Sequence, residues 1–376
     1  MTIYILLLSV TVFFLLLEAG LDDKQKQKTI LLYVTFLILF LVYTLRSLSV
    51  GRDFSGYELL YRMAAQKSLF DVDYVYFESG YVLLQNLFSH AGLPFLVFLA
   101  FIDLVTLIPI LMIVNRYSVR PIFSTLIFIC YIYFEFNMTA IRQAMATSVC
   151  VLGFYAALES KRFGILWYIL FILLAATIHR SALLCLIVLP CFFLSNLSMF
   201  IGMLLLVASV SLGFRRQVLQ FIGYLFHHTI RSSSIYFGWN YVFLLIMGLF
   251  FLLFMPHSNY SFLKSGKTGT KAGMYKLIRS TSDPEQRRVY VTCLMTEIYS
   301  VGLVVYLILG NDTVLRAAQY LLFPIWILIP NTIGSFRRRV RIVSYIAFVV
   351  FFIVFFAKNT LIDNSFDIVP YRFFWE

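Results

Sequence analysis

The chain has 376 residues, of which 61% are hydrophobic and only 13% are charged, and its mean hydropathy is +0.88. Soluble domains contain about 45–50% apolar and about 25% charged residues, so a water-soluble fold could not bury this much apolar surface. The composition excludes a cytosolic enzyme, a disordered scaffold and a secreted disulfide-rich module, and it predicts a single all-α polytopic membrane domain over residues 1–376. The formal charge of +12 does not by itself indicate nucleic-acid binding, because in a membrane protein the distribution of the charges among the loops is more informative than their sum.

A transmembrane helix needs about 20 apolar residues, with about 17 as the usual lower bound. Twelve segments are candidates: 3–20, 29–47, 94–114, 121–136, 142–158, 163–178, 181–194, 199–213, 239–255, 291–309, 315–334 and 342–357. The first is predicted to be a retained helix, because neither a positively charged region nor a small-residue cleavage site accompanies it. The weakest is 181–194, which Pro190 interrupts.

The orientation follows from the excess of Lys and Arg in cytoplasmic loops. One set of alternate loops holds 18 of the 30 basic residues against five acidic residues, so we place these loops in the cytoplasm and both termini outside. The basic residues are Lys24, Lys26, Lys28, Arg116, Arg120, Lys161, Arg162, seven from Lys264 to Arg288, Arg337, Arg338, Arg339 and Arg341. A single crossing over 181–213 would move seven of them outside, so the charges favour twelve spans.

The polar stretch 256–290 is predicted to be a basic cytoplasmic loop. It contains the run Ser265-Gly266-Lys267-Thr268-Gly269, but Ser261 stands where a phosphate-binding loop needs Gly. We therefore interpret the run as a solvated loop. The five cysteines all fall in apolar segments without Cys-x-x-Cys or Cys/His spacing, so buried thiols are expected, and neither a disulfide framework nor a zinc site is indicated.

The first external loop, 48–93, is predicted to carry a short amphipathic helix over Glu58–Lys67 that lies on the membrane surface. Its many aromatic residues have two interpretations. They are interfacial anchors, or some of them stack against sugar rings. The segment 358–376 is predicted to be an external C-terminal tail.

Arginine recurs where spans meet the external side. A charge drawn into the hydrocarbon costs about 2.5–3.5 kcal/mol on the mildest scale, so such residues are functional candidates, although a single one can also snorkel to lipid headgroups. Arginine pairs bidentately with phosphate oxygens, and the set therefore suggests a site for a lipid diphosphate at the membrane boundary. Its members are Arg142, Arg180, Arg316 and Arg372, joined by Arg46 and Arg52.

Glycosyl transfer from a diphosphate also needs a general base near the acceptor hydroxyl. Asp53 is the first candidate, followed by Glu78 and His179. Asp53 could instead pair with Arg52 or cap the following helix, and His179 could be an interfacial hydrogen-bonding residue.

Three acidic residues, Asp103, Glu135 and Glu297, fall within or at the ends of spans. They are interpreted as structural partners of arginines or as a proton path in a transporter. No ligand cluster suggests a metal, so no metal or other cofactor is predicted, and protein cations would neutralise the diphosphate.

Five short motifs occur in a fixed order along the chain. They are Gly51-Arg52-Asp53-x-x-x-Tyr57, Glu78-Ser79-Gly80-Tyr81, Ile141-Arg142-Gln143-x-x-Ala146, His179-Arg180-Ser181-Ala182 and Arg316-x-x-x-Tyr320. In this order and context they resemble the EpsG family, a group of Wzy-like polysaccharide polymerases. Arg52 departs from the pattern, because many members are expected to have a small or hydroxyl residue there.

The resemblance implies a helical fold related to the C-type glycosyltransferases (GT-C) in the bacterial cytoplasmic membrane, with both termini on the periplasmic side. It implies transfer of a growing O-antigen or exopolysaccharide chain from undecaprenyl diphosphate to an incoming lipid-linked repeat unit. The expected partners are these lipid-linked donor and acceptor glycans, membrane lipid and a chain-length regulator, without nucleic acid.

The resemblance also implies residue roles. Arg142, Arg180 and Arg316, with Arg52 and Arg372, would bind diphosphate; Asp53, Glu78 or His179 would orient or deprotonate the acceptor; Tyr57, Tyr81, Tyr320 and Gln143 would contact sugar. Two other functions are compatible with the sequence: an O-antigen ligase and a flippase or transporter for lipid-linked sugars. The early position of the largest external loop argues against the ligase. Transporters usually show internal repeats and Gly- or Pro-broken helices, and of these the sequence shows only Pro190 and Pro324.

Overall fold

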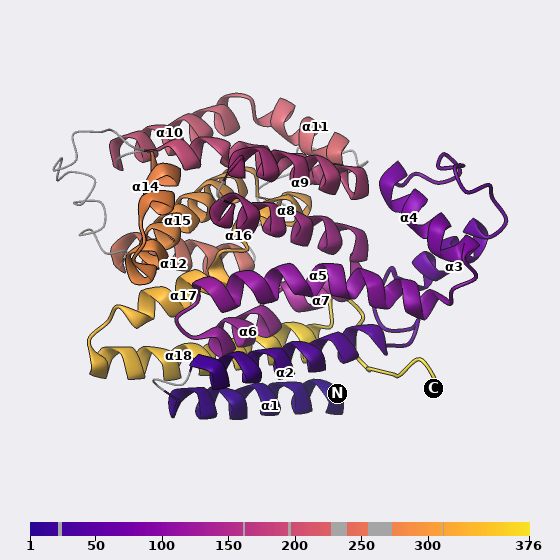
Figure 1. The fold of residues 1–376 in the computed structure, drawn as a ribbon, viewed down its shortest axis with the longest axis horizontal. Helices are drawn as coiled ribbons and strands as arrows, with labels where there is room; N and C mark the ends of the chain where they lie inside the picture. Colours follow the sequence, from indigo (N-terminus) through magenta and orange to yellow (C-terminus); the bar gives the residue numbers. More distant parts are fainter. Residues whose placement is uncertain (22–24, 161, 195–196, 227–238, 255–272, 311) are drawn as a thin grey trace.

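The computed structural model describes residues 1–21, 25–160, 162–194, 197–226, 239–254, 273–310 and 312–376, which form a bundle of helices (Figure 1). Across these residues the regular structure is helical, and the one β-bridge joins Arg46 to Phe373. The expected all-α architecture is therefore confirmed. The Ser265–Gly269 run lies outside the described residues.

Six helices are long and apolar enough to cross a membrane: α1 (Thr2–Ala19), α2 (Gln25–Thr44), α5 (Phe95–Tyr117), α8 (Ile141–Glu159), α15 (Pro284–Leu309) and α18 (Arg338–Phe356), the last continued by the π-helix η2 (Ala357–Asp363). Three further spans are bent pairs: α6 (Pro121–Cys130) with α7 (Tyr133–Thr139) at 59°, α10 (Leu197–Gly213) with α11 (Arg215–Leu225) at 91°, and α16 (Asp312–Leu322) with α17 (Ile325–Gly334) at 50°. The described residues thus contain six such helices, or up to nine spans if each pair counts as one.

The other apolar segments form shorter helices: α9 (Gly164–Ile178), η1 (Arg180–Phe193) and α12 (Trp239–Phe254). Every segment expected from hydropathy is therefore helical, while the number that cross the membrane stays a prediction. The 14-residue η1 winds as a 3₁₀ helix, which rises about 2.0 Å per residue. It therefore extends about 28 Å, close to the hydrocarbon thickness of about 30 Å, where an α-helix of the same length would extend only about 21 Å.

The first loop contains two helices, α3 (Phe54–Ala64) and α4 (Ser79–His90), which pack together beyond the end of the bundle (Figure 1). The amphipathic helix expected at Glu58–Lys67 corresponds to α3, although α3 begins earlier, and α4 was not predicted. Gln85 of α4 donates to the Leu60 carbonyl of α3, and Asn86 donates to the Leu69 and Asp71 carbonyls of the intervening loop. These bonds hold the loop in a fixed shape.

The remaining polar stretch contributes the short α14 (Met274–Ser280) and the first residues of α15. Pro284 is in the first turn of α15, and the Asp283 carboxylate accepts the backbone N–H groups of Glu285 and Gln286 at 3.1 and 3.3 Å. Such a cap contributes about 1 kcal/mol to helix stability. It allows α15 to begin seven residues earlier than hydropathy alone indicates.

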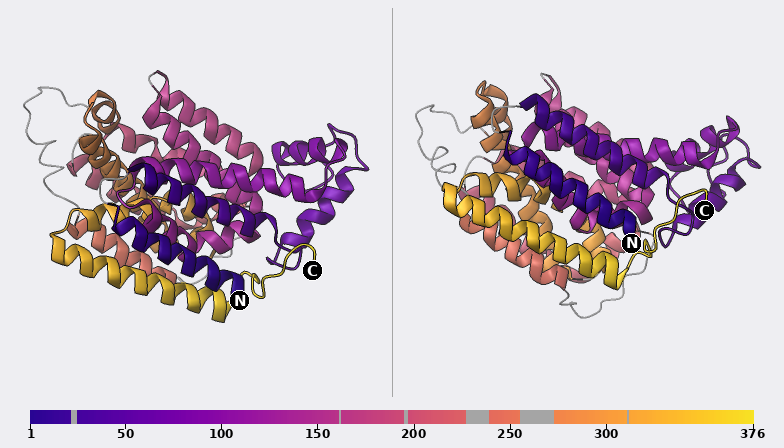
Figure 2. Two further views of the ribbon diagram at one scale, coloured as in Figure 1. Left: turned by 60° about the horizontal axis from the view of Figure 1, so that its bottom comes forward. Right: turned by 90° about the horizontal axis from the view of Figure 1, so that it is seen from below.

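Charged residues separate the bundle into two ends. At one end Glu159 pairs with Arg116 at 3.1 Å and with Arg287 at 3.2 Å, and Arg120 donates to the Glu18 carbonyl. Arg116, Arg120, Glu159 and Arg287 come from the loops expected in the cytoplasm, and Glu18 lies near the end of the first expected span. Both termini lie at the other end with α3 and α4 (Figures 1 and 2), so the structure brings the loops together as the sequence predicted.

The core is centred on α8, which packs against α5, α9 and η1. In contrast, α18 and α1 lie at the edge of the bundle (Figure 2), with few of their side chains buried. Exposed apolar helices of this kind suit a lipid environment. All five cysteines are buried free thiols, as expected.

Candidate functional site

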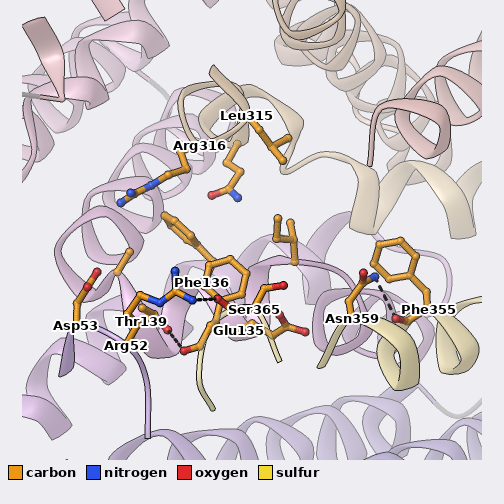
Figure 3. Close-up of a pocket in the computed structure, with 14 residues that line it drawn as sticks. Arg52, Asp53, Glu135, Phe136, Thr139, Leu315, Arg316, Phe355, Asn359 and Ser365 are labelled. Atoms are coloured by element: carbon orange, nitrogen blue, oxygen red, sulfur yellow. Dashed lines mark hydrogen bonds between the residues drawn. The ribbon is translucent and has the colours of Figure 1, made fainter. Parts of the chain in front are cut away.

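A cavity of about 390 Å³ lies at the end of the bundle that carries α3 and the termini. Two broken spans line it, since α7 and α16 each approach it next to their bend, and η2 and the C-terminal tail complete its wall (Figure 3). The polar lining residues are Arg52, Asp53, Glu135, Thr139, Arg316, Gln319, Asn359 and Ser365. Helix breaks at membrane depth are tolerated where they line a cavity, and this cavity is the candidate site.

Arg316 and Gln319 share one face of α16, three residues apart. The Gln319 side chain is buried, yet neither of its amide atoms has a hydrogen-bond partner among the described residues, and the same holds for Nε of Arg316. The Arg316 guanidinium lies 5.6 Å from the Phe136 ring centre and 5.9 Å from that of Phe226. Buried polar atoms are nearly always hydrogen-bonded, so these unpaired donors point to a polar ligand or water.

Arg52 and Asp53 face Arg316 across the cavity (Figure 3). Gly51, just before them, has φ of +108°, and a Cβ there would lie 3.0 Å from the Met138 carbonyl oxygen, so the turn requires glycine. Arg52 pairs with Asp367 at 3.0 Å. Asp53 precedes α3 without a capping hydrogen bond from its side chain, so neither structural role considered for it is observed.

Glu78 and Arg142 form a buried ion pair beside this cavity. Arg142 Nη1 donates to Glu78 Oε2 at 2.6 Å, and the backbone N–H of Arg180 donates to Glu78 Oε1 at 3.0 Å. The guanidinium also lies 3.5 Å from the centre of the Phe77 ring, a cation–π geometry. Glu78 thereby joins the start of α4 to the starts of α8 and η1.

Tyr57 connects the ion pair to the cavity. Its side chain is buried, and the charges of Arg142, Asp53 and Arg316 all act on it. Burial raises the pKa of Tyr57, while Arg142 acts in the opposite direction. The phenol therefore stays protonated near neutral pH. Tyr81 of α4 packs against it with a ring-centre distance of 6.3 Å and is fully buried.

His179, Ser181 and Tyr320 form a second polar chain. The Ser181 hydroxyl lies 2.6 Å from His179 Nδ1 and donates to the Tyr320 hydroxyl at 2.9 Å. The His179 ring lies 5.4 Å from Phe226, which also contacts Arg316. The Phe226 ring thus contacts both His179 of this chain and Arg316 of the cavity.

The remaining expected residues lie at different distances from the cavity. Gln143 Nε2 donates to the backbone carbonyl of Arg316 at 2.8 Å, and thus supports the turn of α16 that lines the cavity. The Arg180 guanidinium lies 5.8 Å over the Tyr224 ring, away from the lining. Arg372 also lies outside the lining, on the tail segment whose backbone carbonyl accepts the Ser47 N–H.

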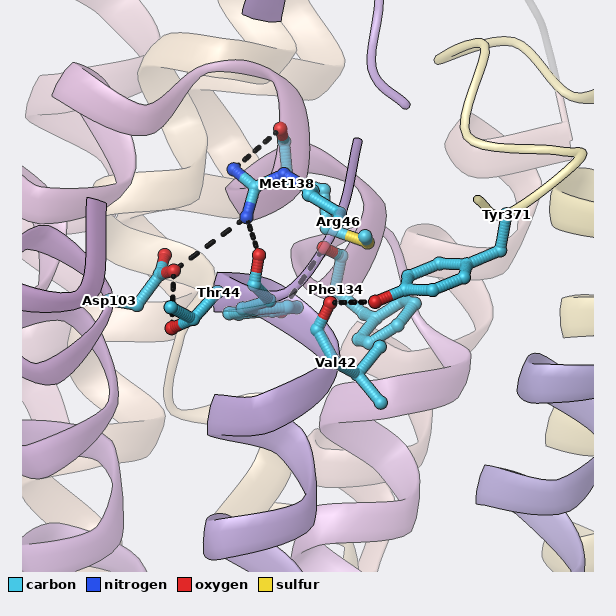
Figure 4. A network of polar contacts seen from close by, with 8 residues as sticks. Val42, Thr44, Arg46, Asp103, Phe134, Met138 and Tyr371 are labelled. Carbon is cyan, nitrogen blue, oxygen red and sulfur yellow. Dashed lines mark hydrogen bonds and ion pairs between the residues drawn. The ribbon is translucent and has the colours of Figure 1, made fainter. Parts of the chain in front are cut away.

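The expectation that Arg46 joins the arginines at the membrane boundary is wrong. Arg46 is 1% exposed, pairs with Asp103 at 3.7 Å and donates to the Met138 carbonyl at 3.2 Å (Figure 4). Its guanidinium also lies 4.1 Å over the Phe54 ring. A buried cation needs a counter-charge, and Asp103 supplies it, which confirms the interpretation of Asp103 as a structural partner of an arginine.

Sequence analysis missed several residues of the cavity. Glu135 was interpreted as a structural or proton-path residue, but it lines the cavity and accepts a hydrogen bond from Thr360. Gln319 could have been found from its position one turn after Arg316. Asn359 and Ser365 carry no local signal, because only tertiary packing brings the C-terminal segment to the cavity. No group of three His, Cys, Asp or Glu in the described ranges could hold a metal ion.

A comparison with protein-family models gives one finding that covers nearly the whole chain. The model of the EpsG family matches residues 29–373, a range that contains every candidate residue named above. No curated protein and no solved structure matches the chain significantly.

Proposed function

The chain belongs to the EpsG family of Wzy-like polymerases, which indicates a membrane polysaccharide polymerase, and from this premise we propose its reaction. The protein transfers a growing glycan from undecaprenyl diphosphate to an incoming lipid-linked repeat unit of O-antigen or exopolysaccharide. The reaction takes place on the external face of the bacterial cytoplasmic membrane.

One observation carries the proposal. The cavity contains buried donors that have no hydrogen-bond partner in the described part of the chain, Arg316 Nε and the Gln319 amide, opposite the carboxylate of Asp53. Unpaired cationic and amide donors suit the oxygens of a diphosphate, and a carboxylate on the opposite wall suits an acceptor hydroxyl. The same cavity thus offers both halves of a glycosyl transfer.

In the proposed step the acceptor hydroxyl oxygen attacks the anomeric carbon of the donor sugar. The bond between that carbon and the diphosphate oxygen breaks, the electron pair leaves with the diphosphate, and Asp53 takes the hydroxyl proton. Arg316 stabilises the growing negative charge, and one preorganised donor of this kind contributes about 10²–10³ in rate.

The other assigned residues have supporting roles. Glu78, held by Arg142 and the Arg180 N–H, fixes the positions of the helix starts around the cavity. Arg142 acts near the diphosphate region through its charge, which together with those of Asp53 and Arg316 acts on Tyr57. Arg52 and Arg372 lie toward solvent and would meet the substrate at the entrance.

The proposed sidedness rests on the separation of charges between the two ends of the bundle. The cavity lies at the end opposite the basic cluster around Glu159, and basic loops are typical of the cytoplasmic side. This supports a cavity that faces outward, with both termini external and twelve spans in a GT-C-like arrangement.

A lipid-linked sugar transporter is a second candidate, because two broken spans line the cavity, as in many transporters. Transporter sites lie near the middle of the membrane, however, whereas Arg52, Asp53 and Ser365 line this cavity from loops at one end of the bundle. The cavity position therefore favours the polymerase over the transporter, and it does not separate the polymerase from a ligase that uses the same donor.

Reconstitution tests the proposal directly. Purified protein is mixed with undecaprenyl-diphosphate-linked repeat units, and the products are separated on a gel. A ladder of increasing chain length is expected from the wild type, and its loss is expected in Arg316→Ala. If the protein moves intact lipid-linked units across vesicle membranes and forms no ladder of longer products, the polymerase proposal is contradicted and the transporter is supported.

A further inference from the structure

A second hollow runs along the bundle next to the candidate site. It has a volume of about 570 Å³ and lies between α12 and α18. Apart from Lys358 and Asn359, its lining is apolar: Val242, Phe243, Ile246, Met247, Ala347, Phe348, Phe351, Val354 and Phe355. We call it the α12–α18 groove.

The groove is built for an apolar occupant. Its floor contains Phe243 and Met247, each 5% exposed, and the Phe243 ring stacks on Phe351 at 5.3 Å. Its rim contains Ile246 and Val354, which are 53% and 61% exposed. Rigid aromatic walls with a flexible Met suit a chain of varying conformation.

The groove meets the polar cavity at one end. Phe355 and Asn359 line both of them. Lys358 stands at this junction, paired with Asp363 at the surface. The α12–α18 groove thus ends at the Lys358 ammonium, next to the polar cavity that contains Arg316.

The length of the groove matches one membrane leaflet. Its lining on α18 runs from Ala347 to Lys358, and at 1.5 Å per residue this covers about 16 Å. Half of the hydrocarbon core is about 15 Å. The groove therefore follows the half of the membrane on the cavity side.

We propose that the α12–α18 groove binds the isoprenoid tail of a polyprenyl diphosphate and delivers its diphosphate past Lys358 and Asn359 to Arg316. This inference rests on the proposed function, since it gives the lipid-linked substrate a path to the cavity. The occupant is a lipid and not a second copy of the chain, because the groove leads into a cationic cavity that a protein surface would leave unfilled.

Binding measurements with probes of two lengths test the groove apart from the head site. The full chain in detergent is titrated with undecaprenyl diphosphate and with geranyl diphosphate, whose tail is too short to follow the groove. In Ala347→Trp the new ring fills the groove. The affinity of this variant for undecaprenyl diphosphate should fall about tenfold or more, because the tail loses apolar burial. Its affinity for geranyl diphosphate should stay unchanged.

Ile346→Trp is the matched control, because Ile346 is the preceding residue on α18, is 61% exposed and does not line the groove. Both affinities should equal those of the wild type. Arg316→Ala should weaken both probes equally, since it removes a headgroup contact. If Ala347→Trp leaves both affinities unchanged while Arg316→Ala lowers both, the groove assignment is overturned and the head site stands. If Arg316→Ala leaves both affinities unchanged while Ala347→Trp lowers that for undecaprenyl diphosphate, the head site is overturned and the groove assignment stands.

A second measurement does not depend on a bulky substitution. Phe351 is replaced by benzoylphenylalanine and the protein is irradiated with undecaprenyl diphosphate present. A lipid adduct that excess unlabelled lipid diphosphate suppresses is expected. An adduct the size of two protein chains would show that a second copy covers the groove and would overturn the proposal.

Discussion

Glu78 Oε2 and Arg142 Nη1 lie 2.6 Å apart although 64 residues separate them in the chain. Both side chains are largely buried, at 4% and 15% exposure, and Glu78 also accepts the backbone N–H of Arg180. A loop helix, a central span and the start of η1 thus meet at one carboxylate. Removing Glu78 leaves the Arg142 guanidinium buried without this carboxylate, and removing Arg142 takes from Glu78 its charged partner on α8.

Loss of one partner should therefore affect folding as well as activity. Glu78→Ala is expected to destabilise the protein by about 3–5 kcal/mol, because the Arg142 guanidinium stays buried without its carboxylate. Arg142→Ala is also expected to be destabilising, because Glu78 loses a charge-assisted hydrogen bond. The double variant should lose less than the sum of the two. Thermal unfolding in detergent measures this. The control is the pair of Glu58 and Arg62, whose Arg side chain is 74% exposed, because an ion pair with a solvent-exposed partner contributes little to stability. Additive effects at Glu78 and Arg142 would show that the pair contributes no coupling.

Arg316 should behave differently, because ring contacts hold its guanidinium and its Nε has no partner among the described residues. Arg316→Ala is expected to lower the polymerisation rate about 10²–10³-fold with only a small change in melting temperature. The gel ladder gives the rate and thermal unfolding gives the stability. Arg62→Ala, at the same end of the bundle but outside the cavity lining, should match the wild type in both. A full-length ladder from Arg316→Ala would remove this residue from the mechanism.

Much of the fold follows from hydropathy and charge. Each apolar segment became a helix, and the basic loops gathered at one end, as Arg116, Glu159 and Arg287 show. The breaks were harder to predict. Pro324 explains the bend between α16 and α17, because proline disrupts a continuous helix, but the bend at Tyr131 and Ile132 involves neither Pro nor Gly. Tertiary packing imposes that bend, and a single sequence does not carry it.

The site was partly predictable for a related reason. Local motifs marked Asp53 and Arg316, which the structure places in one cavity. The same reasoning wrongly grouped Arg46 with the arginines expected to contact substrate. Its position at the end of a span does not distinguish a substrate contact from the buried ion pair with Asp103. The remaining wall, including Asn359, comes from the C-terminal segment, whose place depends on long-range contacts such as that between Tyr4 and the Ile368 carbonyl.

Asp53 and Glu135 are the two carboxylates that line the cavity, and their amide variants should separate the base from a structural acid. Asp53→Asn keeps the side-chain size but removes the proton acceptor, so turnover should fall about 10²–10⁴-fold while binding of undecaprenyl diphosphate is retained. Glu135→Gln should change turnover less, since Glu135 is hydrogen-bonded to Thr360. Steady-state rates and lipid binding on the same preparations test this. Unchanged turnover in Asp53→Asn with a large loss in Glu135→Gln would transfer the base role to Glu135.

Gly80 sets how closely α4 approaches α9. A Cβ at Gly80 would lie 2.3 Å from Thr177 Oγ1 and 2.7 Å from its backbone oxygen, distances that a methyl group cannot occupy. Gly80→Ala should push the start of α4 away from α9, pull Glu78 from the Arg180 N–H and reduce polymerisation strongly. Gly56→Ala is the control, because nothing lies within 4 Å of that position in α3 and alanine favours the helix by about 1 kcal/mol. It should keep full activity and melt at the same or a higher temperature. If Gly80→Ala polymerises as well as Gly56→Ala, the close contact with Thr177 does not position Glu78 for the reaction.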